Sequence, residues 1–490
     1  MTMLGVVGSG VMGAGIAQLA ALGGVRTRLH DSSSEALERA LERVDRDLTR
    51  GAERGHWSTA DAATARARLQ PADDLDGCAL IIEAVPEDLA LKHTVLASLP
   101  RAAVLATNTS SLSVAEVAAG VPGPERVLGM HFFNPPPRLR LVELVAGAAT
   151  APDALELGAS VAAAMGCRVL RARDSVGFIV NRCARPFYAE AMQLLEEGVA
   201  DVATIDRACR LGAGFRMGPF ELMDLIGLDT SLAVAKSFFA RSFGEPRWRP
   251  SQRQAAVVAA GKLGSKTGAG WYEHPYTRPE EPPPGESRRA VSVRGEGAVA
   301  AALRARTRAA PDPAPRAAAP VAFDLRAAAE RDLAAPALVD VSSASLAATG
   351  RPGDVGFVHL PGSGLLELTR LPHSSPALVA GAEDAAAALG LAVSWCEDAP
   401  GLIVPRIVCQ LVNEACFALG DAVAAREDID AGLRHGVNHP RGPFEWGERL
   451  GWAWVEGVLD GLFADRHDPR YRVAPRLRRE AALSRAAAQS

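Results

Sequence analysis

A histidine and a glutamate twelve residues apart are the strongest candidates for chemistry in this sequence. His131 stands in MHFFNPPP (130–137), and Glu143 stands among aliphatic residues in LVELV (141–145). A carboxylate buried among aliphatic side chains needs a partner, because burying a lone charge is costly. We expect His131 to be that partner, since a histidine can take the proton of an alcohol as hydride leaves. The carboxylate would then fix the imidazole tautomer and stabilise the imidazolium.

Two further polar residues are placed to contact a substrate oxygen. Ser110 lies in TNTSSLS (107–113) after a predicted strand, in a loop that could instead only cap a helix. Asn181 lies among apolar residues in GFIVNR (177–182), one turn into a predicted helix. A lone histidine is more often a packed structural residue, but these groups favour a catalytic His131.

A glycine-rich loop near the start of the sequence is typical of a dinucleotide site. It follows a strand predicted over 3–8 and opens a helix of small residues over 10–21, where the glycines allow a tight turn and close approach of a pyrophosphate. Asp31 ends the second strand and is expected to bind the adenosine ribose, which favours NAD over NADP. The residues expected at the cofactor are Gly8, Ser9, Gly10, Val11, Met12, Gly13 and Asp31. The alternatives are a glycine-rich turn without a cofactor and an Asp31 that only caps a helix.

The elements that must position these residues alternate between strands and helices. Apolar strands are predicted over 3–8, 25–30, 79–85 and 104–107, with helices between them. Such alternation predicts a parallel, doubly wound α/β sheet of the Rossmann type. From about residue 174 to about 245 the pattern is helical, which predicts an all-helical second domain.

After a proline-rich linker at 276–289 the chain repeats itself. Adding 224 to a residue number pairs Glu143 with Glu367, Asp174 with Asp398, and GPFE (218–221) with GPFE (442–445). A second copy of the helical domain, preceded by a reduced α/β domain, is therefore predicted. The predicted division is a NAD-binding Rossmann domain (1–175), a helical substrate or dimerisation domain (176–275), the linker (276–289), a degenerate Rossmann-like domain (290–398) and a second helical copy (399–490).

The second copy departs from the first at the residues expected to do chemistry. Its glycine segment at 294–297 lacks the phosphate loop, and Asn181 is matched by Pro405. His359 precedes Glu367 by eight residues rather than twelve, and no Asn-Pro-Pro element follows it. We therefore predict that the second copy is not catalytic.

Composition and charge exclude several other classes of protein. The net charge of −4 in 490 residues argues against nucleic acid or an anionic membrane as the main partner. The sequence has no run of about 18 apolar residues and no signal-peptide pattern at its start. Seven scattered cysteines without metal-ligand spacing predict free thiols, no metal and a cytoplasmic enzyme.

Taken together, the motifs resemble the L-3-hydroxyacyl-CoA dehydrogenase family. They run in family order over residues 3–272, and the duplicated C-terminal half resembles the longer bacterial members. The motifs are GSGVMGAGIAQ (8–18), EAVPEDLALK (83–92), TNTSSLS (107–113), HFFNPPP (131–137), LVELV (141–145), DSVGFIVNR (174–182), LGAGFRMGPFELMDLIGLD (211–229) and KLGSKTGAGWY (262–272).

The resemblance implies oxidation of a (3S)-3-hydroxyacyl-CoA thioester to the 3-oxoacyl-CoA with NAD, in fatty-acid β-oxidation or phenylacetate catabolism. It implies that His131 is the base, Glu143 its partner, and Ser110 and Asn181 contacts of the substrate oxygen. It also implies further residues at the cofactor site, which are Glu87, Lys92, Ser110, Asn134 and Lys266. Glu87 is a candidate partner of Arg182 across the domain cleft, Lys266 could instead be a solvated lysine, and Arg50 and Arg54 are alternative candidates for the CoA nucleotide.

Two other functions are compatible with parts of this pattern. A β-hydroxyacid dehydrogenase has a similar glycine loop but uses a catalytic lysine in its helical domain, and no lysine lies near Asn181. A cofactor-binding relative without turnover would keep the loop but need not keep His131 and Glu143. The sequence does not decide whether the acyl chain of the substrate is short, adipyl-type or longer. It also leaves two assemblies, a homodimer and a monomer with an internal pseudo-dimer.

Overall fold

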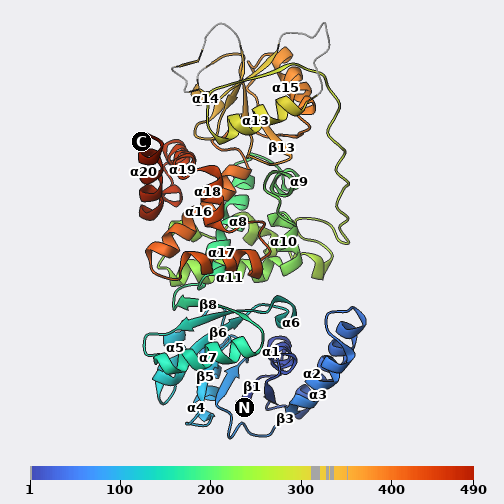
Figure 1. The fold of residues 1–490 in the computed structure, drawn as a ribbon, viewed down its shortest axis with the longest axis vertical. Helices are drawn as coiled ribbons and strands as arrows, with labels where there is room; N and C mark the ends of the chain where they lie inside the picture. Colours follow the sequence, from blue (N-terminus) through green and yellow to red (C-terminus); the bar gives the residue numbers. More distant parts are fainter. Residues whose placement is uncertain (1–2, 311–319, 327–329, 332–335, 350, 490) are drawn as a thin grey trace. The chain divides into compact units, whose positions relative to one another are not determined.

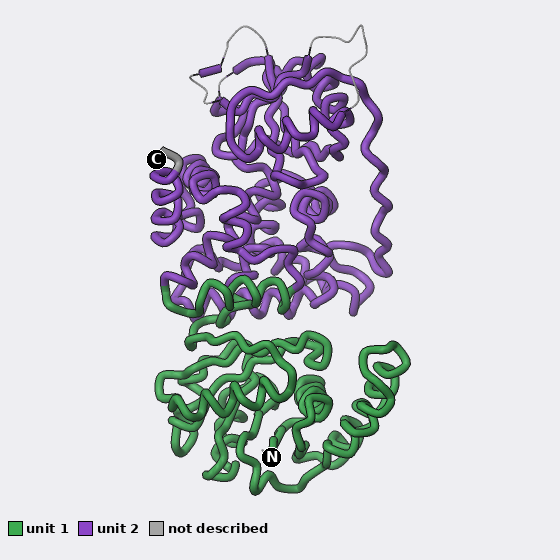
Figure 2. The backbone as a smooth tube through the Cα atoms, in the orientation of Figure 1, with its two compact units in different colours: residues 1–182, 421–437 green, residues 183–420, 438–490 purple. Residues whose placement is uncertain are grey.

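The computed structural model describes residues 3–310, 320–326, 330–331, 336–349 and 351–489. The chain forms two compact units, coloured separately in Figure 2. The first unit contains residues 1–182 and 421–437, and the second contains residues 183–420 and 438–490. The short segment 421–437 belongs to the second sequence repeat, yet it packs in the first unit.

An eight-stranded sheet forms the centre of the first unit, in the order β3-β2-β1-β4-β5-β6-β7-β8 (Figure 1). Only the pairing of β6 with β7 is antiparallel. The strands are β1 (Met3–Val7), β2 (Arg26–His30), β3 (Leu69–Pro71), β4 (Leu80–Glu83), β5 (Val104–Thr107), β6 (Val127–Phe132), β7 (Leu141–Ala146) and β8 (Arg168–Arg173). This confirms the predicted parallel α/β sheet of the Rossmann type.

Helices connect these strands and bury their apolar faces. Leu4, Val6, Leu29 and Ile82 of neighbouring strands are fully buried in one core with Ile16. The helices are α1 (Val11–Leu22), α2 (Ser34–Glu53), α3 (Thr59–Arg68), α4 (Leu89–Ser98), α5 (Val114–Ala119), α6 (Pro136–Leu139) and α7 (Pro152–Ala164). The strand order reverses between β1 and β4, and ligands of such sheets bind at this switch point, beyond the carboxyl ends of the strands.

The second unit contains the first helical copy, which begins on the long helix α8 (Val180–Glu196). It continues through α9 (Val202–Ala208), a short π-helix (Cys209–Ala213), α10 (Pro219–Ile226), α11 (Leu228–Arg241) and α12 (Gln252–Ala259). The extended proline-rich segment then leads to the second sheet.

The second helical copy confirms the repeat. It consists of α16 (Val404–Gly420), α17 (Arg426–Gly436), α18 (Pro443–Leu450) and α19 (Trp452–Arg466), followed by α20 (Pro475–Gln489). The first four of these begin 224 residues after α8, α9, α10 and α11. The same local sequence signals therefore start the same helices twice.

The second sheet is a reduced version of the first. Its six described strands follow the chain order, β9-β10-β11-β12-β13-β14, and again one pair, β12 with β13, is antiparallel. The elements are β9 (Val291–Arg294), α13 (Ala298–Ala309), β10 (Val321–Asp324), β11 (Leu338–Asp340), α14 (Leu346–Thr349), β12 (Val355–Val358), β13 (Leu365–Thr369), α15 (Pro376–Ala388) and β14 (Ala392–Trp395). Here β9 pairs directly with β10, as β1 does with β4, so no described strand matches β2 or β3.

The repeats exchange short helices between their sheets. In the first unit, α17 packs on β7 and β8, where the backbone N–H of Arg171 donates to Asp428 and that of Arg173 to the Val423 carbonyl. In the second unit, Arg207 of α9 donates to the carbonyl of Val393. Each sheet thus receives a helix from the other repeat, as two subunits of a dimer would exchange them.

Candidate active site

The glycine loop between β1 and α1 has the geometry of a phosphate-binding turn. Gly8 has a φ of +96°, which residues other than glycine rarely adopt. A Cβ at Gly13 would lie 1.8 Å from the Gly8 carbonyl oxygen, whereas a Cβ at Gly10 would meet no atom within 4 Å. Gly10 therefore faces open space at the N-terminus of α1, where a pyrophosphate fits.

A cavity of about 840 Å³ opens in front of this loop within the first unit. It is lined by Gly8, Ser9, Gly10, Val11, Met12, His30, Asp31, Ala84, Val85, Pro86 and neighbouring residues of α2 and α4. Gly13 is buried behind it against the loop. The residues present therefore fit a dinucleotide, and six of the seven expected from the loop and β2 line one cavity.

Asp31 is anchored at the edge of this cavity. One of its oxygens accepts hydrogen bonds from the backbone N–H and the hydroxyl of Ser9, both at 2.7 Å, and the other accepts from the N–H of Ser33. Burial alone would raise the pKa of Asp31, but the hydrogen bonds from Ser33 and Ser9 outweigh it and hold the pKa below its ordinary value. A carboxylate so held is charged at neutral pH and suits ribose hydroxyls.

His131 and Glu143 form a buried pair in the first unit. The antiparallel register of β6 and β7 places the two residues directly opposite each other, and Nδ1 of His131 lies 2.5 Å from Oε2 of Glu143. Glu143 is fully buried and His131 is 7% exposed. Nε2 of His131 makes no hydrogen bond to any residue the structure describes, so it is free to act on a substrate.

Glu143 has a second task at the start of α8. Its other oxygen, Oε1, accepts the backbone N–H groups of Ile179 and Val180 at 2.9 and 2.8 Å. These are N–H groups that a helix cannot satisfy within itself at its N-terminus. One carboxylate therefore orients the imidazole and caps the helix that carries Asn181.

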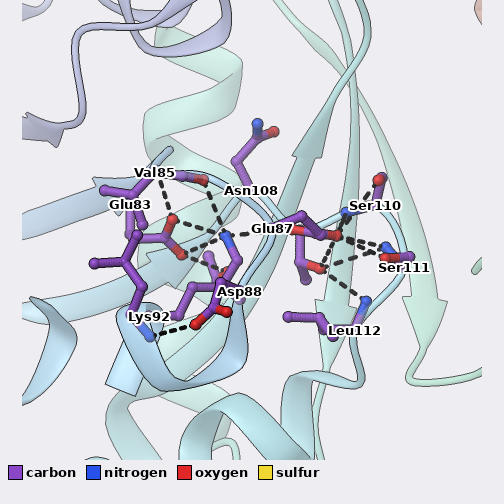
Figure 3. A network of polar contacts seen from close by, with 12 residues as sticks. Glu83, Val85, Glu87, Asp88, Lys92, Asn108, Ser110, Ser111 and Leu112 are labelled. Carbon is purple, nitrogen blue, oxygen red and sulfur yellow. Dashed lines mark hydrogen bonds and ion pairs between the residues drawn. The ribbon is translucent and has the colours of Figure 1, made fainter. Parts of the chain in front are cut away.

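A polar network holds the loop that contains Ser110 (Figure 3). Glu87 accepts hydrogen bonds from the hydroxyl of Thr109 and from the backbone N–H groups of Ser110 and Ser111. Burial alone would raise the pKa of Glu87, but Thr109, the Lys92 ammonium and the two N–H groups hold it below its ordinary value. Glu87 thus fixes the backbone of the serine loop.

Lys92 links this network to the central strand β4 (Figure 3). Its ammonium lies 2.8 Å from Glu83 and 3.4 Å from Glu87, and the side chain is 1% exposed. Thr107 and the N–H of Val85 also donate to Glu83, which is fully buried. Any part that Lys92 plays in cofactor binding therefore passes through the two glutamates.

The expected pairing of Glu87 with Arg182 is wrong. Glu87 is taken up by Lys92 and the serine loop, while Arg182 forms an ion pair of 2.6 Å with Asp421, from the segment before α17. The sequence does not reveal this, because Asp421 is 239 residues away and its contact depends on the exchange of helices.

Arg50 and Arg54 lie together at a second cavity of about 280 Å³ in the first unit. Asn134, expected at the cofactor, lines this cavity, and Arg43 and Arg138 add further positive charge to it. Arg43 also donates to the Ser9 carbonyl, and with Val11 it lines both this cavity and that of the glycine loop. The structure thus does not choose between Arg50 and Arg54 but gives both the same cavity.

Asn181 and Lys266 are placed less directly. Asn181 is the second residue of α8, immediately after the two N–H groups capped by Glu143. Lys266 forms an ion pair of 2.6 Å with Asp229 in the second unit and is 45% exposed. Its expected place at the cofactor stays a prediction.

The second copy keeps the glutamate but not the histidine. Glu367 caps α16, since the N–H of Ile403 donates to it at 2.7 Å and that of Val404 at 3.2 Å. Its partner across the strands is Val358, so a valine stands where the first copy has His131. His359 is bonded to the Leu365 carbonyl, and burial lowers its pKa to about 4.

Several site residues were missed by sequence reasoning. Asn108 accepts the N–H of Phe132 and so ties the serine loop to the residue after His131. Glu83 stands among aliphatic residues in LIIE, the same signal that identifies Glu143, and this signal could have found it. Arg43 carries no local signal, because a helix-surface arginine is ordinary in sequence.

Metal sites and membrane-spanning helices are absent from the part of the chain that the structure describes. No group of three or more His, Cys, Asp or Glu side chains there is arranged to hold a metal ion. Within that part of the chain, no helix is both long and apolar enough to span a bilayer.

Comparisons with known proteins give consistent matches. The family model described as the NAD-binding domain of 3-hydroxyacyl-CoA dehydrogenase matches residues 3–175, and that of its C-terminal domain matches residues 177–274 and 401–490. The chain is 36% identical to the 3-hydroxyadipyl-CoA dehydrogenase of Escherichia coli K12, over 98% of this chain and 97% of that protein.

Two further matches separate the whole chain from its first half. A probable 3-hydroxybutyryl-CoA dehydrogenase of Bacillus subtilis is 37% identical, over 96% of its own length but 55% of this chain. The crystal structure of a 3-hydroxybutyryl-CoA dehydrogenase from Escherichia coli K12 matches 99% of both chains with a TM-score of 0.86 and 33% identity. The full two-copy architecture therefore occurs in a solved relative.

Proposed function

The chain belongs to the 3-hydroxyacyl-CoA dehydrogenase family and is an NAD-dependent oxidoreductase, and on this basis we propose that its first copy oxidises (3S)-3-hydroxyacyl-CoA through His131 and Glu143. The products are 3-oxoacyl-CoA, NADH and a proton. The observation that carries this proposal is the 2.5 Å contact of Glu143 with Nδ1 of His131, which leaves Nε2 for the substrate.

His131 accepts the proton of the C3 hydroxyl on Nε2 in this mechanism. With Nδ1 directed at a carboxylate, Nδ1 carries the hydrogen and Nε2 presents its lone pair. As the hydroxyl proton is transferred, the imidazole becomes an imidazolium, and Glu143 stabilises that charge at close range. In the reverse direction His131 returns the proton to the C3 oxygen.

The bound NAD supplies the acceptor for the hydride that leaves C3. The chain's own part is to hold the dinucleotide, with Asp31 at the ribose and the N-terminus of α1 at the pyrophosphate. Val11, which lies at the first turn of α1, lines both that cavity and the second one.

In this proposal the thioester substrate is bound by residues that precede His131 in the sequence and by one that follows it. Arg50 and Arg54 are proposed to bind the phosphates of the CoA nucleotide, since they line a cationic cavity. Ser110 and Asn181 are proposed to donate to the C3 oxygen. Glu87 supports Ser110 by holding the backbone of its loop.

The physiological pathway depends on which acyl chain the enzyme accepts. The relatives carry names with a four-carbon acyl group and with a six-carbon dicarboxylic one. A place in fatty-acid β-oxidation or phenylacetate catabolism, and a cytoplasmic location, stay predictions.

Replacing His131 with alanine tests the proposal. The variant should lose NADH-dependent reduction of acetoacetyl-CoA by a factor of about 10² to 10⁴, the usual contribution of a general acid or base. NADH binding, followed by nucleotide fluorescence, should stay at the wild-type level. Retained turnover would contradict the role of His131 and favour a β-hydroxyacid dehydrogenase mechanism. A wild-type chain that binds NADH but turns over no acyl-CoA would favour a binding protein.

A further inference from the structure

The two cavities of the first unit have Arg43 in common. The cavity of the glycine loop, of about 840 Å³, and the second cavity, of about 280 Å³, share Val11 and Arg43 among their described lining residues. All of the residues that line either cavity belong to the first unit. Of the two shared residues only Arg43 carries a charge, so it is placed to act on ligands in both cavities.

Arg43 belongs to a row of arginines on α2. Its members are spaced by four, seven and four residues, which puts them on one face of the helix, and they are Arg39, Arg43, Arg50 and Arg54. Arg39 lines the glycine-loop cavity, whereas Arg50 and Arg54 line the second one. Because α2 packs against α1 (Figure 1), the row extends from the expected dinucleotide site to the expected CoA site.

The positive charge of this row is not neutralised by neighbouring carboxylates. None of its four arginines forms an ion pair with a carboxylate that the structure describes. On the same helix, by contrast, Arg46 pairs with Glu42 at 3.7 Å. Each cavity has one carboxylate among its described lining residues, Asp31 in the first and Asp47 in the second. An excess of guanidinium groups at both cavities suits the phosphates of two nucleotides.

Arg43 also contacts the phosphate-binding turn directly. Its Nη2 donates to the carbonyl oxygen of Ser9 at 3.0 Å and to that of Gly10 at 3.1 Å. These residues immediately precede α1, whose first N–H groups are expected to bind a pyrophosphate. Nε and Nη1 of Arg43 donate to no residue that the structure describes. One nitrogen therefore holds the loop, and the other two remain as donors for phosphate oxygens.

We propose that Arg43 binds the phosphates of both nucleotides, those of NAD in the glycine-loop cavity and those of CoA in the second cavity, and thereby couples their binding. This inference rests on the proposed function, because that function assigns NAD and CoA to these cavities. Both nucleotides are polyanions, and neighbouring like charges repel. A cation that contacts both offsets this repulsion, so that one bound nucleotide does not weaken the binding of the other.

The second copy has no described counterpart of this row. Between β9 and β10 its described elements comprise only α13, which corresponds to α1. No described helix there matches α2. The row is thus found in the copy that has the phosphate loop, which agrees with a role in binding nucleotides.

The test measures the binding of NADH with and without coenzyme A, in about 0.15 M salt. The measured quantity is the ratio of the Kd for NADH at saturating CoA to the Kd without CoA, from NADH fluorescence. Arg43→Met should raise the Kd of each nucleotide alone about tenfold, because charged hydrogen bonds are lost. The ratio should rise about three- to tenfold above that of the wild type, because the repulsion between the nucleotides is no longer offset.

Two further variants separate charge from fold. Arg46→Met is the matched control, since it removes the same charge from the same helix at a residue that lines neither cavity. It should leave both Kd values and the ratio at the wild-type level. Arg43→Lys keeps the charge but not the planar fork, so its ratio should lie between those of the wild type and Arg43→Met. If circular dichroism shows that Arg43→Met does not fold, Arg43→Gln, which can still donate to the loop carbonyls, takes its place.

Each outcome decides between separate hypotheses. An unchanged ratio in Arg43→Met would overturn the coupling, even if NADH alone binds more weakly, because Arg43 would then only hold the glycine loop. An unchanged Kd for CoA alone would likewise remove Arg43 from the CoA site. Neither result affects the proposed function as long as the wild type reduces acetoacetyl-CoA. A wild type that binds NADH but neither binds CoA nor reduces acetoacetyl-CoA would reject both proposals.

Discussion

The two copies differ in the residue that lies opposite the glutamate in each antiparallel hairpin. In the first, Glu143 faces His131 across β6 and β7, and in the second, Glu367 faces Val358 across β12 and β13. Both glutamates accept the first N–H groups of the helix that follows, α8 or α16. The glutamate therefore has a structural task that survives the loss of the histidine.

On the cofactor side, the described part of the second copy differs from the first copy by whole strands rather than by one residue. The described part of its sheet has no strand that matches β2, which ends directly before Asp31 in the first copy. Asp324 ends β10, which corresponds to β4, so it matches Glu83 and is held by Arg326 at 2.7 Å. Among the residues that the structure describes, the second copy thus differs from the first by a whole strand next to the expected ribose carboxylate, not by a single residue.

The largest expected difference between the copies concerns the two glutamates. Glu143→Gln should lower kcat about 10²- to 10⁴-fold, because the amide NH₂ would face Nδ1 and place the hydrogen on Nε2. Glu367→Gln should keep wild-type kcat, and both variants should keep their helix caps through the amide oxygen. Steady-state kinetics with acetoacetyl-CoA checks the pair. Similar losses in both would break the distinction between catalytic and structural glutamate.

Stability as a function of pH should also distinguish the copies. Burial raises the pKa of Glu367 from 4.5 to about 8, so the folded state binds this proton more tightly than the unfolded state. The resulting stabilisation is present below pH 4.5 and is lost as the pH rises through about 8. The free energy of unfolding of Glu367→Gln, relative to that of the wild type, should therefore increase between pH 5 and 9, by about a few kcal/mol at most. Urea unfolding at several pH values measures this, and parallel curves would refute it.

The exchange of helices should make the second copy necessary for the first active site. A side chain at Gly432 of α17 would press on Val180, whose Cγ2 lies 3.0 Å from the Cβ position, and on Ile179. Gly432→Val should destabilise the first unit by about 1–3 kcal/mol and lower kcat, because both residues donate to Glu143. Gly457→Val is the control, since its Cβ meets no atom within 4 Å. Unchanged kcat in Gly432→Val would show that α17 does not support the site.

The smallest expected effect concerns the cofactor. The chain should bind about one NADH, and Asp31→Ala should raise Kd about tenfold by removing the charged acceptor of the ribose hydroxyls. Asp324→Ala removes a strand-end carboxylate of the second copy, and as the control it should leave Kd unaltered. Fluorescence titration gives both numbers, and a stoichiometry of two would mean that the second sheet also binds the nucleotide.

Much of this protein was readable from its sequence because the signals are local. The glycine loop, the alternation of strands and helices, the 224-residue offset, and His131 with Glu143 each depend on residues close together in the chain or on simple self-similarity. The pairing of His131 with Glu143 was predictable because a hairpin brings neighbours in sequence into register.

Only the tertiary structure decided features that depend on distant parts of the chain. The sequence pointed to His359 as the counterpart of His131, whereas the strand register places Val358 there, because the second hairpin is shorter. Arg182 pairs with Asp421 rather than Glu87, because α17 crosses to the first sheet.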